Sequence, residues 1–364
     1  MKIRELIRPL EELAPLSFQE SYDNAGLLVG SYSQEVSSAL ICLDLTEEVL
    51  DEAIEKGAQI VICHHPIIFG GIKRLNGSNL VERCVMKAVK HDIAIYAAHT
   101  NLDAVHGGVS TRLAEIIGLQ DIRMLQDMKG ELLKLVTFVP SEFAEKVRQA
   151  LYAAGAGSIG KYDSCSFSLA GMGRFRGGEG TNPFVGQAGI LHCEAEERIE
   201  LMMPRSRKSA VLKALSAAHP YETPAYDLIA LENTYPLAGI GAIGILPEPE
   251  DEMAFLSRVK RLLGTGSVRH SAPTGRTILK VALCGGSGAG LIRTAIAAGA
   301  DIYITADVKY HDFFLAENKI LIADAGHFET EQFTCELIRD ILINKFHNFA
   351  AHLSERIKNP IHYL

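Results

Sequence analysis

The sequence contains no apolar run of about 18 residues, the length that a membrane-spanning helix needs. It also lacks an excess of basic residues, because 36 Lys and Arg stand against 44 Asp and Glu and give a formal net charge of −8. A broad nucleic-acid-binding surface normally requires a basic face. The composition therefore argues against a membrane protein and against a nucleic-acid-binding protein.

None of the seven cysteines is paired with another in a CxxC spacing, so a reduced intracellular compartment is the simplest interpretation. Cys63 lies beside His64, but we interpret it as a core residue and not as a metal ligand. Residues 1–15 combine acidic side chains with apolar residues at helical spacing, which predicts an amphipathic helix and not a signal peptide. Together these features predict a cytoplasmic protein.

The length of 364 residues favours two domains, or one domain that carries an insertion. Short apolar runs alternate with helical patterns from about residue 38 to 118 and again from about residue 236, which predicts βαβ units and a mostly parallel sheet. Between them the pattern changes. We therefore predict a discontinuous α/β domain over residues 1–124 and 234–364, interrupted by a separate domain over residues 125–233.

The inserted segment has the predicted element order β-α-β-β-α-β, which is typical of a ferredoxin-like α+β domain. Its stretch rich in glycine and serine, residues 155–189, is interpreted as long loops or a hairpin.

Residues that commonly bind metals follow three of the predicted buried strands. His64 and His65 follow residues 58–63, Asp103 follows residues 93–98, and His327 and Glu331 follow residues 319–324. Ligands of open α/β sheets bind outside the carboxyl ends of the strands, so we expect these side chains to meet at one sheet edge.

The spacing of these residues supports metal binding. His327 and Glu331 are four residues apart, which places both on one face of a helix. An aspartate such as Asp103 can bridge two divalent ions with its two oxygens. Five ligands exceed the need of one tetrahedral site, so two ions fit better. The alternatives are a structural histidine pair and a turn-forming or helix-capping Asp103. Zinc, iron, manganese and nickel all suit this ligand set.

Four further positions are candidates for substrate contacts or proton transfer. His99 and His311 are candidate proton shuttles, Lys309 a candidate phosphate ligand, and the glycine turn around Gly286 and Gly288 a candidate anion site at a helix N-terminus. The turn matches neither a Walker A loop nor the GxGxxG dinucleotide motif. The alternatives are a satisfied loop histidine and a capped surface helix.

Seven segments together resemble the Nif-three-like family, whose members are GTP cyclohydrolase I type 2 homologs. They are YDNAGLLVG (22–30), CHHPIIFGGIKRL (63–75), AAHTNLD (97–103), HPYETPAYDLIAL (219–231), CGGSGAG (284–290), TADVKYHD (305–312) and DAGHFETE (324–331). The segment 219–231 resembles the signature of the PII/CutA-like domain that the longer bacterial members carry as an insertion.

The resemblance implies a dinuclear divalent-metal site on the same five residues, two ions per subunit. It further implies a toroidal homohexamer whose inserted domains cap the openings. The activity it implies is hydrolysis of GTP with water to formate and 7,8-dihydroneopterin triphosphate. Three alternatives stay open: a metal-dependent phosphoesterase, a non-enzymatic metal-binding or regulatory ring protein, and, against the acidic composition, a nucleic-acid-binding ring.

Overall fold

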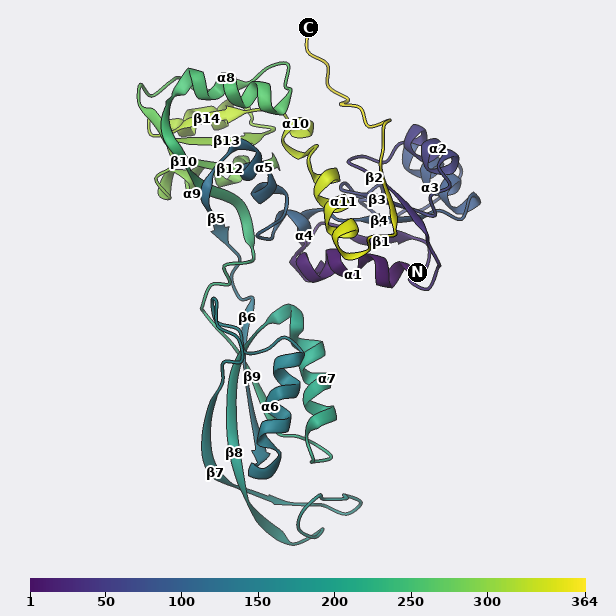
Figure 1. Cartoon of the computed structure of the whole chain (residues 1–364), viewed down its shortest axis with the longest axis vertical. Coiled ribbons are helices and arrows are strands. Elements are labelled where there is room, and N and C mark those ends of the chain that lie inside the picture. Colours follow the sequence, from purple (N-terminus) through teal and green to yellow (C-terminus); the bar gives the residue numbers. More distant parts are fainter. The chain divides into compact units, whose positions relative to one another are not determined.

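The computed structural model describes residues 1–364, which form two compact units. One unit comprises Met1–Asp127 together with Pro236–Leu364, and the other comprises Met128–Tyr235 (Figure 1). The chain therefore leaves the larger unit once and returns to it once.

The larger unit contains a five-stranded sheet with the order β1-β4-β3-β2-β15. Its strands are β1 (Gly26–Val29), β2 (Ser38–Cys42), β3 (Ile60–Cys63), β4 (Ala94–Ala97) and β15 (Ala350–Leu353). All neighbours run parallel except β1, which is antiparallel to β4. Every residue of β2, β3 and β4 is buried, as expected for a parallel sheet covered on both faces.

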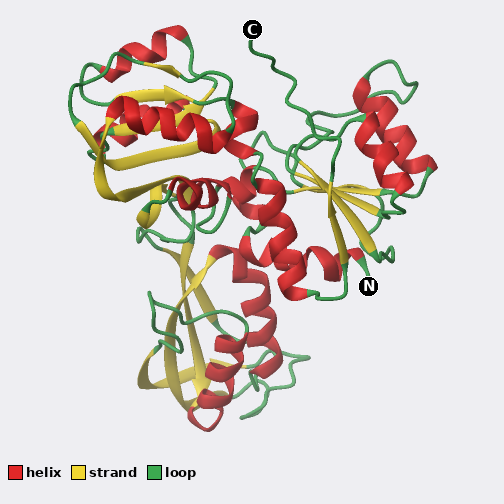
Figure 2. Cartoon of the chain, turned by 45° about the horizontal axis from the view of Figure 1, so that its top comes forward, coloured by secondary structure: helices red, strands yellow, loops and turns green.

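Two pairs of helices cover this sheet (Figure 2). The helices are α1 (Ile3–Leu13) with α11 (Thr334–Lys345), and α2 (Glu47–Glu55) with α3 (Leu80–Lys90). Thr46 and Asn79 cap α2 and α3 by accepting hydrogen bonds from backbone amides of the first turn. Leu40, Val61 and Ile95 lie side by side on neighbouring strands and pack in the core beneath α2 and α3.

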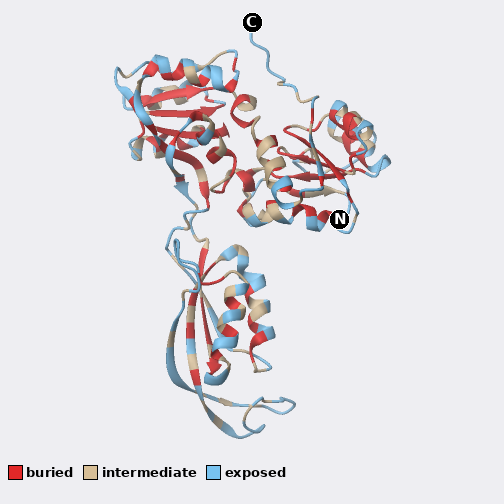
Figure 3. Ribbon diagram, viewed as in Figure 1, coloured by how far each residue is buried: buried red, intermediate tan, exposed pale blue.

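A second sheet of the larger unit has six strands in the order β11-β14-β13-β12-β10-β5. Its strands are β5 (Gln120–Asp127), β10 (Gly239–Asp251), β11 (Arg269–His270), β12 (Thr277–Ser287), β13 (Ile302–Ala306) and β14 (Leu321–Asp324). One hydrophobic cluster joins it to α5 (Val109–Ile117) and α8 (Glu252–Leu263), and another joins it to α9 (Ile292–Ala297). The buried residues of both sheets appear red in Figure 3.

The prediction of one mostly parallel sheet is correct for the first sheet and wrong for the second. In the six-stranded sheet only β12, β13 and β14 run parallel, whereas β11, β10 and β5 pair antiparallel with their neighbours. The whole smaller unit separates β5 from β10 in the sequence, so these two strands are not consecutive strands of a βαβ crossover. Without a crossover the two strands can pair antiparallel.

The smaller unit is a four-stranded antiparallel sheet with the order β7-β8-β6-β9 and two helices. Its elements are β6 (Leu132–Pro140), α6 (Ala144–Ala153), β7 (Phe167–Arg176), β8 (Leu191–Pro204), α7 (Lys208–Ala218) and β9 (Tyr226–Ala230). Leu135, Ile199 and Leu201 of the sheet pack against Val147 and Val211 of the helices. The element order is β-α-β-β-α-β, and the glycine-rich segment contains β7 and the turn of the β7–β8 hairpin.

The structure contains no helix that is both long and apolar enough to cross a membrane. All seven cysteines are free thiols. Cys63 is buried in β3, where its Sγ lies 3.4 Å from the carbonyl oxygen of Tyr96, so it packs in the core as the sequence analysis proposed.

We predict that Glu52→Ala lowers the free energy of unfolding of the larger unit by about 2 kcal/mol. The Glu52 carboxylate is 2 % exposed and accepts hydrogen bonds from the Ser354 hydroxyl and from the backbone amides of Glu355 and Arg356. Alanine would leave the Ser354 hydroxyl and the Glu355 amide without this acceptor and would remove the ion pair with Lys56, whereas the Arg356 amide keeps Ser354 Oγ as a partner. The change is measured as the shift of the thermal unfolding midpoint.

The matched control is Glu55→Ala on the same helix, which removes only an exposed ion pair with Arg356 and is expected to cost less than about 1 kcal/mol. Burial alone raises the pKa of Glu52, but the hydrogen bonds outweigh burial and lower it below 4.5. The contribution of Glu52 is therefore present above about pH 4.5 and lost as the pH falls further. Equal destabilisation by both variants would contradict the prediction.

Candidate metal centre

The structure brings the five predicted metal ligands together. His64 and His65 directly follow β3, Asp103 ends α4 (Thr100–Asp103) after β4, and His327 and Glu331 begin and end α10 (His327–Glu331) after β14. Only the expectation of a single sheet edge is wrong, because β3 and β4 belong to the five-stranded sheet and β14 belongs to the six-stranded sheet. The cluster lies where strand ends of the two sheets meet.

Glu331 is at the centre of the cluster. Its Oε2 lies 3.0 Å from His65 Nε2, 3.0 Å from His327 Nε2 and 3.8 Å from His64 Nε2. His64 Nε2 also lies 3.7 Å from Asp103 Oδ1. Two ligand atoms that are each about 2.1 Å from one tetrahedral ion are roughly 3.4 Å apart. The distances in the cluster bracket this value.

The ligand atoms form three overlapping groups in which all atoms lie within 4.8 Å of one another. The groups are His65, His327 and Glu331; His64, Asp103 and Glu331; and His64, His65 and His99. Two of the groups share the carboxylate of Glu331. The sequence suggests Asp103 as a carboxylate that could bridge two ions, but in the structure Glu331 has the more central position.

Each of the four histidines is held by a hydrogen bond at Nδ1. The partners are the carbonyl oxygen of Ala98 for His64 (2.7 Å), Asp44 for His65 (2.8 Å), Asp23 for His99 (2.8 Å) and Asp307 for His327 (2.7 Å). Metal-binding histidines characteristically use this arrangement, because a proton held on Nδ1 leaves the lone pair of Nε2 free for the metal.

Two polar atoms of the cluster are buried without a hydrogen-bond partner, His64 Nε2 and Asp103 Oδ1. Such atoms are costly in a folded protein unless another group satisfies them. Both atoms belong to the same ligand group, which Glu331 completes. A cation held by this group would satisfy both atoms, so the cluster can bind a metal ion.

Burial and the close spacing of the groups shift several pKa values. Burial raises the pKa of Asp103 to about 7. Burial alone would lower the pKa of His65, but hydrogen bonds to Asp44 and Glu331 outweigh burial and raise it to about 10. The hydrogen bond to Glu331 raises the pKa of His327 to about 9. Burial alone raises the pKa of Glu331, but hydrogen bonds from the histidines hold it well below its usual value.

The glycine turn has a clear structural role beside the cluster. Gly286 has a φ of +60°, and a Cβ at this position would lie 2.0 Å from Glu331 Oε1. Its amide donates to Thr330 Oγ1, and the amide of Gly285 donates to Ser110 Oγ, so neither amide is free to bind a phosphate. Gly288 precedes a three-residue 3₁₀ helix (Ala289–Leu291) that leads directly into the six-residue α9. The turn makes room for Glu331, which the sequence analysis did not anticipate.

Lys309 and His311 lie on an exposed segment that follows β13. Lys309 is two residues beyond Asp307, the partner of His327, and its ammonium forms no ion pair. The His311 ring contacts Tyr310 and Phe314, and no interaction joins it to the cluster. The structure thus brings His99 to the cluster and shows no contact of Lys309 or His311 with it.

The sequence analysis missed Asp23 and Asp44, which hold His99 and His65. Asp44 follows the strand β2, so the strand-end pattern that identified the histidines could have found it. Asp23 lies in a loop before β1 that no strand-end pattern marks, although it belongs to the segment 22–30 that contributes to the family resemblance. It also accepts hydrogen bonds from the amide and hydroxyl of Thr100. Burial alone raises the pKa of Asp23, but these hydrogen bonds and that of His99 lower it to about 2.

The fold and the cluster define a class of mixed α/β proteins in which strand ends of two sheets deliver histidines and carboxylates to one candidate metal centre. The model of the family Duf34/NIF3 (NGG1p interacting factor 3) matches residues 1–360, and the chain belongs to this family.

Similar proteins agree with this assignment. A Halalkalibacterium halodurans protein named GTP cyclohydrolase 1 type 2 homolog is 41% identical over 326 residues, covering 88% of this chain and 87% of its own. The Bacillus subtilis protein of the same name is 37% identical over 330 residues, covering 89% and 88%. The crystal structure of a Bacillus cereus protein related to NIF3 superposes with a TM-score of 0.86 at 37% identity, covering 100% of this chain and 99% of that chain.

We predict that Gly286→Ala greatly lowers the amount of divalent metal bound per chain, because the new Cβ would displace the Glu331 carboxylate. Purified protein would be reconstituted with zinc, and bound metal would be counted by inductively coupled plasma mass spectrometry. Gly290→Ala is the matched control, since a Cβ there meets nothing within 4 Å and should leave metal content unchanged. Equal metal content in the two variants would show that the position of Glu331 does not matter for binding.

Proposed function

We propose that the cluster binds two divalent metal ions and that the protein is a metal-dependent hydrolase of the GTP cyclohydrolase 1 type 2 kind. The observation that carries the proposal is the orientation of the histidines: a carbonyl or carboxylate holds each Nδ1, and the Nε2 atoms converge on Glu331. The names of the two bacterial relatives support the choice of reaction.

The ligand groups indicate how two ions would be divided. His65 and His327 would hold one ion, His64 and Asp103 would hold the other, and Glu331 would serve both. This mixed set of imidazoles and carboxylates suits zinc, iron, manganese or nickel, so the cluster does not select one of them by ligand type. When bound, such ions lower the pKa of water to about 7 and so supply hydroxide at neutral pH.

The proposed reaction converts GTP and water to formate and 7,8-dihydroneopterin triphosphate, which requires hydrolytic opening of the guanine ring at C8. His99 is the residue best placed to hold and transfer a proton, because it lies against His64 and His65 and Asp23 fixes its Nδ1. Lys309, whose ammonium has no partner in the protein, is proposed to bind the phosphates. The structure offers no contact that supports His311 as a proton shuttle.

The proposal is tested by measuring formate release from GTP with protein reconstituted separately with each of the four metals. We expect release by the wild type, and a loss of at least about 100-fold in His64→Ala and in Glu331→Ala because both lose ligands. The exposed His347→Ala is the control and should match the wild type.

Absence of formate from demonstrably metal-loaded protein would contradict the cyclohydrolase assignment. Release of phosphate from phosphoesters would then favour the phosphoesterase alternative, and stoichiometric metal without any turnover would favour a metal-binding or regulatory role. The toroidal homohexamer implied by the family resemblance belongs to the same proposal, and sedimentation velocity would reveal it as a species of six chains.

Asp23→Asn tests the role of His99 separately. Asparagine keeps the size of the side chain but cannot stabilise a protonated His99 by charge, so we expect kcat for formate release to fall roughly 10- to 100-fold. Bound metal should stay at the wild-type level, because Asp23 belongs to none of the ligand groups. A parallel loss of metal would instead identify His99 as a ligand, and an unchanged kcat with an unchanged pH profile would exclude a role in proton transfer.

A further inference from the structure

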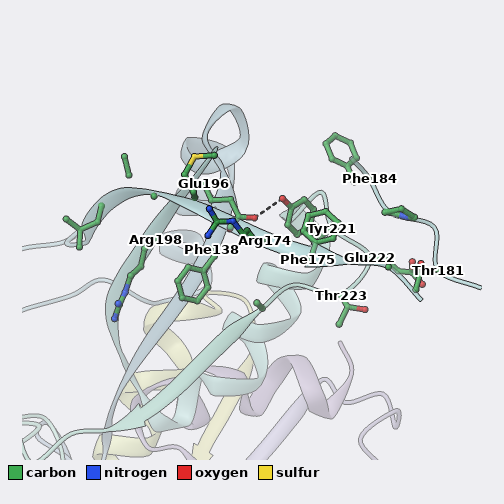
Figure 4. A pocket seen from close by; sticks show the side chains of 18 residues that line it. Phe138, Arg174, Phe175, Thr181, Phe184, Glu196, Arg198, Tyr221, Glu222 and Thr223 are labelled. Atoms are coloured by element: carbon green, nitrogen blue, oxygen red, sulfur yellow. Dashed lines mark hydrogen bonds between the residues drawn. The ribbon is translucent and has the colours of Figure 1, made fainter. Parts of the chain in front are cut away.

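The smaller unit contains a cavity of about 690 Å³ that has no part in the proposed chemistry. Its walls come from β7 and β8, from Phe138 of β6, from the segment that follows β7 and from the segment that precedes β9 (Figure 4). Small-molecule sites in proteins typically have volumes of roughly 300–1,000 Å³. The cavity is therefore large enough for a small organic ligand.

A buried carboxylate lies in the wall of this cavity. Glu196 is 8 % exposed, and no Lys, Arg or His side chain forms an ion pair with it. Its only hydrogen bond comes from the hydroxyl of Tyr221, which donates to Oε1 over 2.8 Å (Figure 4). Oε2 has no partner in the protein. A carboxylate in so buried a position normally requires further donors.

The wall is shaped to accommodate this carboxylate. Gly173 lies beneath it, and a Cβ at that position would be 2.1 Å from Glu196 Oε2. Burial and the hydrogen bond to Glu196 raise the pKa of Tyr221 well above its usual value, so the phenol keeps its proton and acts as the donor. Glu196 is thus left as an acceptor, and its Oε2 is open to N–H or O–H groups of a ligand in the cavity, which would replace solvent there.

The other walls favour a flat ligand that carries an anionic group. The aromatic rings of Phe138, Phe175 and Tyr221 line the cavity, and those of Phe175 and Tyr221 have centroids 5.7 Å apart. Of the two lining arginines, Arg198 pairs with Glu200, whereas Arg174 pairs with no carboxylate. Aromatic rings favour stacking with a planar group, and a free guanidinium favours a phosphate or carboxylate.

We propose that this cavity is a second ligand site, which takes a planar heterocycle with two adjacent N–H donors directed at Glu196. The 2-amino-4-oxopyrimidine edge of guanine and pterin compounds has this pattern, with a ring N–H beside an exocyclic amino group. Adenine has a ring acceptor in the corresponding place and would face the carboxylate with a repulsive lone pair. A site built to accept specific donors discriminates strongly against analogues that lack them.

The experiment uses the full chain with the metal centre disabled by His64→Ala and Glu331→Ala, so that the metal centre cannot account for binding. Isothermal titration calorimetry would be performed with GMP, with pterin and with AMP. We expect one GMP or one pterin per chain, and binding of AMP weaker by at least about tenfold. Arg174→Ala should weaken GMP and leave pterin unchanged, which separates the nucleotide phosphate from the shared ring edge.

Glu196→Gln is the decisive variant, because an amide can donate where the carboxylate only accepts. It should weaken GMP by at least about tenfold and shift the preference toward AMP. Glu197→Gln is the matched control, since Glu197 is the next residue of β8, pairs with Arg148 and does not line the cavity. Thermal unfolding would confirm that both variants are folded.

Two results would overturn this proposal: no binding of GMP or pterin to the folded chain, or binding that Glu196→Gln leaves unchanged. Neither result bears on formate release at the metal centre, because the titrations use protein in which that centre is disabled. Gly173→Ala gives an independent check, since its Cβ would displace the Glu196 carboxylate and should weaken both ligands.

Discussion

The larger unit depends on one buried carboxylate, that of Glu331, which is 4 % exposed and lies within 3.8 Å of three histidine nitrogens. An isolated carboxylate in this position would be strongly destabilising, so its charge has to be balanced by the imidazoles or by metal ions. The backbone around it is adapted to this need, because Gly286 leaves space that any side chain would fill. The strand ends of the two sheets thus meet around Glu331 and its partners.

A second set of residues prepares the histidines for this role. Asp44, Asp23 and Asp307 bind Nδ1 of three histidines, and the carbonyl oxygen of Ala98 binds the fourth. These contacts restrict each ring to one orientation, so little freedom would be lost when a metal binds. His99, which Asp23 holds, belongs to none of the ligand groups that contain Glu331, and for this reason we propose it for proton transfer.

The smaller unit also contains a buried carboxylate, but the groups around it differ from those around Glu331. Its buried Glu196 has one hydroxyl partner, no cation and a glycine beneath it, in a cavity with aromatic walls. In the candidate metal centre the unsatisfied atoms include a histidine nitrogen and a carboxylate oxygen, a combination that suits a metal ion. In the cavity the acceptor stands among aromatic rings, a combination that suits an organic ring with N–H donors.

The amino-acid sequence determined the chemistry and the local structure. The apolar runs predicted the buried strands. The positions directly after these strands, together with the i, i+4 spacing, then predicted the candidate ligands His64, His65, Asp103, His327 and Glu331, because both features are local properties of the sequence. Tertiary structure alone decided that these strand ends come from two sheets, that Glu331 and not Asp103 is central, and that Asp23 approaches His99 across 76 positions of sequence. It likewise decided that the glycine turn accommodates Glu331, and that Glu196, Tyr221 and Gly173 form a cavity. Such contacts join residues distant in the sequence, and no periodicity or spacing within a single segment records them.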